Sequence, residues 1–81
     1  MKIKAIYDNF GKTFDKYTVY YNYKENDGTY FGRGMSHNPY SPNGFGMCIS
    51  GNLGRHNGKH IKFEDLPKDC QKVINSDLMG V

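Results

Sequence analysis

Three stretches of the chain alternate apolar and polar residues with the period of two that a half-buried β-strand requires. The residues expected on the inner faces are Ile3, Ala5 and Tyr7 in residues 2–7, Tyr17, Val19, Tyr21 and Tyr23 in residues 17–24, and Phe45, Met47 and Ile49 in residues 45–50. Tyr20 falls on the face opposite Val19. Tyr, Val and Thr suit a pleated surface, so residues 17–24 are a strand by composition as well as by pattern.

Turn residues divide these strands from their neighbours. Asn9-Phe10-Gly11-Lys12 predicts a turn after residues 2–7. Glu25-Asn26-Asp27-Gly28 predicts a tight hairpin turn, because Asp-Gly supplies the positive φ that such turns need. Residues 29–35 should then pair back, antiparallel to residues 17–24. Gly32 and Gly34 within that strand indicate a bulge or a close approach by another group. Residues 36–44 and 51–58 are rich in Gly, Asn, Ser or Pro, which predicts loops. A short last strand is expected over residues 60–63.

The C-terminal segment has the period of a helix instead. Its apolar face consists of Leu66, Cys70, Val73, Ile74 and Leu78. Asp65 is a plausible N-cap, Pro67 suits the first turn, and Gly80 is a plausible stop. The whole pattern predicts an α+β fold in which residues 1–81 form a single domain, with one C-terminal helix packed on a four- to five-stranded antiparallel sheet.

Composition narrows the class of protein. Five Phe and seven Tyr in 81 residues indicate a core built from aromatic rings. No stretch approaches the roughly 20 apolar residues that span a bilayer, and the alternating N-terminus lacks the apolar core of a signal peptide. We therefore expect a cytoplasmic protein without membrane contact, in which Cys48 and Cys70 stay reduced.

Charge is distributed unevenly along the chain. Residues 28–63 contain four Lys or Arg, all three histidines and eight of the ten glycines, but no Asp or Glu, and so carry a formal charge of +4. Arginine and Gly-rich backbone both bind anions, and interleaved rings could stack on a base. The candidate contacts for an anionic partner are Arg33, His37, Tyr40, Phe45, Arg55, His56, Lys59 and His60. The alternative is a solvated basic face whose glycines only make turns.

Catalytic and metal sites are weighed and set aside. Cys48, His56, His60 and Cys70 include an H-x₃-H spacing, but no Cys-x₂-Cys knuckle accompanies it. The basic segment has no carboxylate pair, and no serine lies in a nucleophile elbow. The sequence therefore predicts a non-enzymatic protein with no catalytic residues, no metal and no cofactor. A small metal-assisted hydrolase and a virion structural protein remain weaker alternatives.

Three stretches together resemble a group of short uncharacterised proteins encoded by phages and other mobile elements. They are Asp15-Lys16-Tyr17-Thr18-Val19, Gly34-Met35-Ser36-His37-Asn38-Pro39 running on to Gly44-Phe45-Gly46, and Gly58-Lys59-His60-Ile61 leading into Phe63-Glu64-Asp65-Leu66-Pro67. The resemblance covers residues 15–75. It implies an accessory protein that inhibits a host defence system, anti-CRISPR-like in manner, by stoichiometric binding to a host defence protein or nucleoprotein complex. The alternative is a small nucleic-acid- or nucleotide-binding module that acts on phage material.

Overall fold

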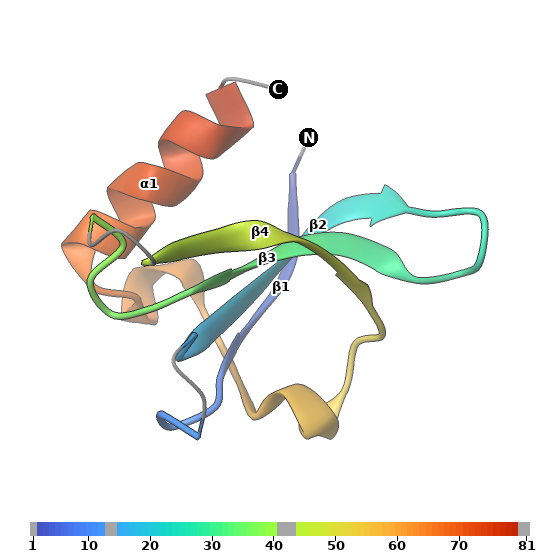
Figure 1. The fold of residues 1–81 in the computed structure, drawn as a ribbon, viewed down its shortest axis with the longest axis horizontal. Helices are drawn as coiled ribbons and strands as arrows, with labels where there is room; N and C mark the ends of the chain where they lie inside the picture. The colour runs from blue at the N-terminus through green and yellow to red at the C-terminus, as the bar shows by residue number, and fades with distance from the viewer. Residues whose placement is uncertain (1, 13–14, 41–43, 80–81) are drawn as a thin grey trace.

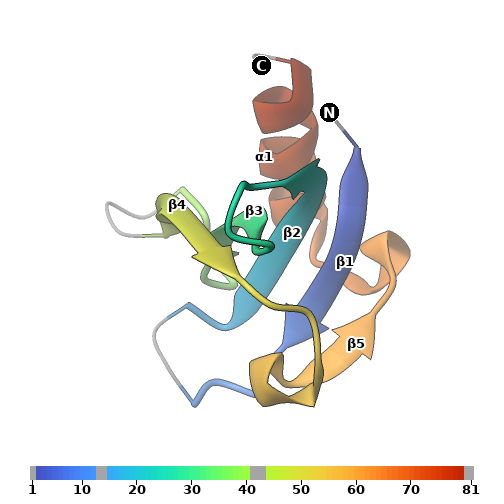
Figure 2. The ribbon, with the colours of Figure 1, turned by 90° about the vertical axis from the view of Figure 1, so that its right-hand side faces the viewer.

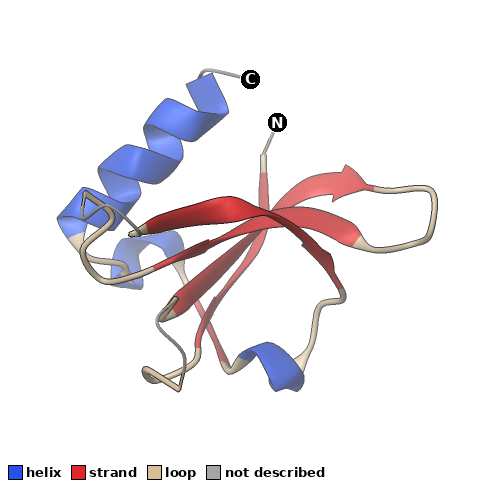
Figure 3. Ribbon diagram, viewed as in Figure 1, coloured by secondary structure: helices blue, strands red, loops and turns tan. Residues whose placement is uncertain are grey.

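The computed structural model describes residues 2–12, 15–40 and 44–79. Its elements are β1 (Ile3–Asp8), β2 (Tyr17–Lys24), β3 (Tyr30–Met35), β4 (Phe45–Gly51), the 3₁₀ turn η1 (Arg55–Asn57), β5 (Lys59–Ile61), the 3₁₀ turn η2 (Phe63–Asp65) and α1 (Lys68–Met79). Over these residues, five antiparallel strands form one sheet in the order β4-β3-β2-β1-β5 (Figure 1). Helix and sheet segregate as the sequence predicted, so the α+β fold is confirmed (Figure 3).

The main core lies between α1 and one face of the sheet. Figure 2 shows α1 behind the strands. The buried members of this core are Ile6, Tyr17, Val19, Tyr21, Met35, Leu66, Cys70 and Ile74. Leu66, Cys70, Ile74 and Leu78 of the predicted helical face are confirmed, whereas Val73 is only half-buried and is not among the residues of this core. The predicted inner face of β2 is confirmed except at Tyr23, which is exposed.

A second, smaller cluster occupies the opposite face of the sheet. Ala5, Tyr7 and Tyr20 are buried there, and Leu53 packs against them from the loop after β4. The placement of Ile3 with Ala5 and Tyr7 on one inner face was wrong. An irregularity between Ile3 and Ala5 shifts the register against β2, and a one-residue shift moves a side chain to the other face, so Ile3 packs on the main core.

The same effect corrects the expectation for β4. A register shift separates its two ends, because three residue steps on β4 match two steps on β3. Phe45 packs against the main core as predicted, whereas Ile49 lies opposite Gly32 and is exposed. The side chain of Met47, the third predicted inward residue, lies outside the described residues.

Glycines permit two features of the β2–β3 hairpin. Gly28 has a φ of +90° in the turn, as Asp-Gly predicted, and the Gly28 amide donates to the Glu25 carbonyl at 3.0 Å. Gly32 lies against β2, where an added Cβ would stand 2.6 Å from the Val19 carbonyl oxygen. The predicted close approach at Gly32 is therefore confirmed.

The segment that leads into α1 differs in detail from its prediction. Asp65 is not the N-cap of α1, which begins three residues later; it belongs to η2, where its carboxylate accepts a hydrogen bond of 3.0 Å from the Lys62 amide. Pro67 precedes the helix, and its carbonyl accepts from the Gln71 amide. The last strand ends at Ile61 rather than at residue 63, and Gly80 lies outside the described residues. None of the helices in the described ranges has the length and apolar character needed to cross a membrane.

Candidate binding surface

The structure separates the eight predicted contact residues into three groups. Arg33 and Phe45 lie on the face of β3 and β4 that α1 covers. His37 and Tyr40 lie in the loop between β3 and β4. Arg55, His56, Lys59 and His60 lie on η1 and β5. Figures 1 and 2 both show the β3–β4 loop and η1 at different ends of the sheet, so the acid-free segment is not one continuous surface.

Arg33 is held in an internal ion pair. Its Nε lies 3.0 Å from Oδ2 of Asp77 on α1, and its guanidinium lies 5.0 Å from the Phe45 ring centroid. The Arg33 side chain is only 23% exposed. An arginine neutralised in this way ties the helix to the sheet and has little charge left for a ligand, and Phe45 beneath it packs on the core.

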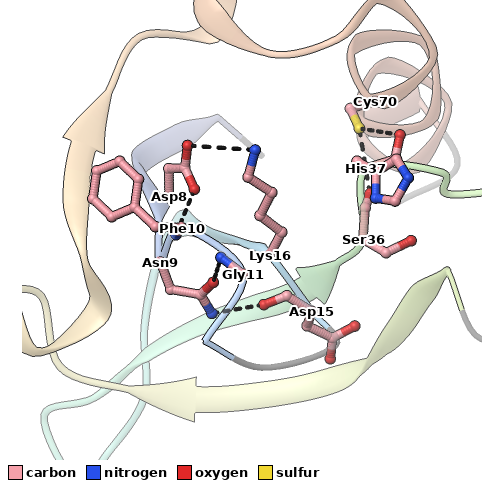
Figure 4. Close-up of polar contacts among 9 residues, drawn as sticks. All are labelled: Asp8, Asn9, Phe10, Gly11, Asp15, Lys16, Ser36, His37 and Cys70. Atoms are coloured by element: carbon pink, nitrogen blue, oxygen red, sulfur yellow. Dashed lines mark hydrogen bonds and ion pairs between the residues drawn. The ribbon is translucent and has the colours of Figure 1, made fainter.

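The β3–β4 loop presents its two predicted residues to solvent. His37 and Tyr40 are both exposed, with Tyr40 at 62%. The loop is anchored by Ser36, whose hydroxyl donates a hydrogen bond to the Asn38 carbonyl. Figure 4 shows a second anchor, the Cys70 Sγ, which lies 3.5 Å from the Ser36 carbonyl oxygen. This loop is therefore a separate exposed site, away from the remaining basic residues.

The third group gathers four basic or ionisable side chains within six residues. Arg55, His56, Lys59 and His60 are all exposed. Gly54 and Gly58, which flank η1, have φ of +140° and +108°, values that favour glycine and let the chain turn sharply at both ends of η1. We call these four residues the basic segment.

Side chains from the second core cluster hold the basic segment in place. The Tyr20 hydroxyl donates to Asn57 Oδ1 at 3.0 Å, and the Gly54 amide donates to the Tyr7 hydroxyl at 3.0 Å. The Tyr7 ring also meets the His60 ring edge-on at 5.5 Å. Burial raises the pKa of the Tyr20 phenol, with the neighbouring Tyr7 adding to the effect, so the Tyr20 phenol remains a neutral donor. A turn fixed by these contacts is ordered before any partner arrives.

A feature that sequence reasoning missed lies beside the basic segment. Phe10, in the turn after β1, is 67% exposed and has a φ of +62°, which is uncommon for a residue with a side chain. Figure 4 shows how the turn is held: the Phe10 amide donates to Asp8 Oδ1 at 2.8 Å, and the Gly11 amide donates to Asn9 Oδ1 at 2.9 Å. The turn itself was predicted from Asn9 and Gly11, but its exposed ring was not.

The Phe10 turn and the basic segment are neighbours. Lys59 is paired with Asp8 in the β1–β5 ladder, and Gly58 packs so closely on the Asp8–Asn9 backbone that a Cβ there would clash. The Asp8 carboxylate already pairs with Lys16 Nζ at 3.9 Å. The turn that carries Phe10 and the segment that carries the basic side chains therefore lie against each other, and Figures 1 and 2 show both below the strands. Lys59 and His60 follow each other on β5 and so point to opposite faces of that strand. This region presents the exposed Phe10 ring and four exposed basic or ionisable side chains. We call it the Phe10–basic surface.

The residues weighed as zinc ligands do not meet. Cys48 is exposed on β4, Cys70 is buried on the inner face of α1, and His56 and His60 lie on the basic segment. Over the described ranges, no three His, Cys, Asp or Glu side chains are grouped as a metal site requires. Burial raises the pKa of the Cys70 thiol, which favours its neutral, unreactive form.

Comparison of the chain with protein-family models, with curated proteins and with solved structures finds no match.

Proposed function

We propose that this protein acts by binding, not by catalysis, and that it inhibits a host defence system by stoichiometric attachment to one of its components. The Phe10–basic surface makes the contact. Its partner is a host defence protein or nucleoprotein complex that presents an anionic surface, either phosphate groups or an acidic protein surface that imitates them. The resemblance to phage accessory proteins supplies the biological context.

One observation carries the proposal: the turn of the exposed Phe10 ring packs against the backbone of a segment that has four exposed basic or ionisable side chains and is held by hydrogen bonds with Tyr20 and Tyr7. Aromatic anchors and Arg dominate the energetics of protein interfaces. Preorganisation lowers the entropic cost of binding, and cationic groups steer an anionic partner toward the surface. The same residues lack the paired acid and base that hydrolytic chemistry uses.

The test is an infection assay in cells that carry single, defined defence systems. Expression of the wild-type chain should restore plating of a phage that the sensitive system otherwise blocks. The double variant Arg55→Glu with Lys59→Glu should lose this activity, because it reverses two charges that face the partner. The double variant Lys68→Glu with Lys72→Glu makes the same change in net charge on exposed positions of α1 and should keep it.

Both double variants must be shown to fold, for which circular dichroism and thermal unfolding suffice. Retained activity in the Arg55–Lys59 variant would show that the basic segment is not part of the site.

The variant Phe10→Ala measures the contribution of the ring apart from that of the charges. It should lower the affinity for the partner by about tenfold or more, the range expected for a buried interfacial anchor.

The second candidate function is a module that binds nucleic acid or nucleotide directly. The observation that favours it is the exposed Phe10 ring on the turn that packs against Gly58, since a base could stack on the ring while the exposed Arg55 and Lys59 meet phosphates. Titration with short bare RNA and DNA over a range of salt concentrations distinguishes the two. Direct binding should lose affinity log-linearly with salt, with about one counterion released per phosphate contacted. No binding to bare nucleic acid would rule this candidate out.

A further inference from the structure

The backbone at Phe10 has a conformation that disfavours the residue found there. Its φ of +62° lies in the left-handed region, which costs stability for a residue with a Cβ and which Asn or Gly adopts more readily. The Phe10 ring is also 67% exposed, so it returns little of the stabilisation that a buried ring gives. Folding alone therefore does not account for a phenylalanine at this position.

The turn around Phe10 is held firmly enough to impose this conformation. The Lys12 amide donates to the Asn9 carbonyl at 3.3 Å and closes the turn. The Asn9 amide donates to the Lys16 carbonyl at 2.9 Å, and Asn9 Nδ2 donates to the Asp15 carbonyl at 2.8 Å. An unfavourable backbone conformation persists only where its surroundings fix it in this way, and such positions cluster at functional sites.

The Phe10 ring projects by itself. In the part of the chain that the structure describes, no aromatic ring stacks on it and no cation lies over its face. Figure 4 shows the ring and the Lys16 side chain on opposite sides of the Asp8 carboxylate. Surfaces that bind single-stranded nucleic acid stack successive bases on several rings along a groove. A single ring at the end of a tight turn has the geometry of an anchor that fills a pocket.

The charged groups nearest to the ring in the chain are mainly cationic. Lys12 is exposed on the same turn, and the exposed Lys59 is paired with Asp8 in the β1–β5 ladder. The Asp8 carboxylate is only 17% exposed, and it already pairs with Lys16 Nζ and accepts from the Phe10 amide. A complementary surface around the ring is therefore acidic.

We propose that the partner is a protein that receives the Phe10 ring in an apolar pocket with an acidic rim. This inference rests on the proposed function, because it specifies the partner for the Phe10–basic surface. The pocket buries the exposed ring, and the rim pairs with the lysines around the turn. The turn fixes the position of the ring before binding, which lowers the entropic cost of filling the pocket.

Three substitutions at position 10 distinguish a pocket from a stacked base in the infection assay. Phe10→Leu should keep most of the restored plating, because leucine is apolar and still fits the pocket. Phe10→Trp should lower plating by about tenfold or more because its larger ring overfills the pocket, and Phe10→Asn should do the same because it removes the anchor. Tyr23→Asn removes another exposed ring, on the β2–β3 hairpin, and should leave plating unchanged.

Urea denaturation of the same variants needs no partner. Phe10→Asn should unfold at a higher urea concentration than the wild type, because asparagine adopts positive φ more readily. Phe10→Leu should unfold near the wild-type concentration. Phe10→Asn would thus be more stable and yet inactive, which a purely structural role of Phe10 does not allow. An unfolding midpoint lowered by Phe10→Asn would show that the ring serves the fold, and would overturn the inference.

The infection assay separates failure of this inference from failure of the proposed function. Activity kept by Phe10→Trp and lost by Phe10→Leu would replace the pocket with a stacked base. Activity kept by Phe10→Asn but lost by Arg55→Glu with Lys59→Glu would overturn the anchor and leave the charges as the site. Activity kept by both, or a wild type inactive against every system tested, would remove the proposed function itself.

Discussion

At the scale of single residues, three side chains that are far apart in the sequence meet in one cluster: Tyr21, Arg33 and Asp77. Asp77 near the end of α1 accepts hydrogen bonds from the Tyr21 hydroxyl at 2.5 Å and from Arg33 Nε at 3.0 Å. Burial raises the pKa of the Tyr21 phenol well above its usual value, and the hydrogen bond to the Asp77 carboxylate raises it further. A carboxylate near a helix C-terminus is unfavourable by itself, and these two donors offset that cost.

This cluster predicts how stability falls at alkaline pH. Because the pKa of Tyr21 is higher in the folded chain than its ordinary 10.0, the unfolded chain releases the proton first as pH rises. The stabilisation from Tyr21 is therefore complete below about pH 10 and is lost progressively above it. At neutral pH, Tyr21→Phe should lower the free energy of unfolding by about 1–3 kcal/mol.

Urea denaturation at neutral and alkaline pH measures the effect. The stability gap between wild type and Tyr21→Phe should narrow as pH rises past the ordinary tyrosine pKa. Tyr23→Phe is the matched control, since the Tyr23 ring is exposed and its hydroxyl removal should cost little at any pH. A gap of constant size across this range would show that the buried phenol is not linked to folding.

At the scale of elements, the sequence pattern predicted where the strands and the helix lie. It did not predict which face of the sheet every side chain of β1 and β4 occupies. Period-two alternation correctly predicted the buried residues of β2 as far as Tyr21, and helical spacing predicted the residues that α1 buries in the core. Alternation failed at Ile3 and Ile49, because each lies beyond a register irregularity that reverses the face. Such irregularities depend on pairing with a neighbouring strand, which a single strand's pattern does not contain.

Gly32 tests the packing of β2 against β3. An alanine Cβ at this position would stand 2.6 Å from the Val19 carbonyl oxygen and 2.8 Å from the Tyr20 ring, and the backbone atom cannot move aside cheaply. Gly32→Ala should therefore lower the free energy of unfolding by about 1–3 kcal/mol, the usual cost of overpacking. Ser50→Ala, at an exposed position of β4, should change it by less than about 0.5 kcal/mol. Chemical denaturation of the two variants makes the comparison, and equal stabilities would mean that the strands separate to admit the methyl group.

At the scale of the whole molecule, the fold divides the acid-free segment instead of gathering it. Four of the predicted contact residues are exposed close together in the chain: Arg55, His56, Lys59 and His60. The sequence grouped them with Arg33, which pairs with a carboxylate 44 positions away. It also missed Phe10, since a single Phe in a predicted turn gives no signal of exposure. Both errors come from tertiary contacts that the sequence does not show. Arg33 pairs with Asp77 and is mostly covered, so its charge is not available at the surface. Gly58 packs on the Asp8–Asn9 backbone, so the turn that carries Phe10 lies next to the basic segment.

The central claim is that the Phe10–basic surface is where this protein meets its partner. Amide NMR of the ¹⁵N-labelled chain, titrated with the defence component that the infection assay identifies, tests that claim residue by residue. The account predicts that signals of residues 9–11 and 54–60 shift or broaden first, and that those of the β2–β3 hairpin and the exposed face of α1 stay in place. Perturbations centred on that hairpin or on α1, with residues 54–60 unaffected, would contradict it.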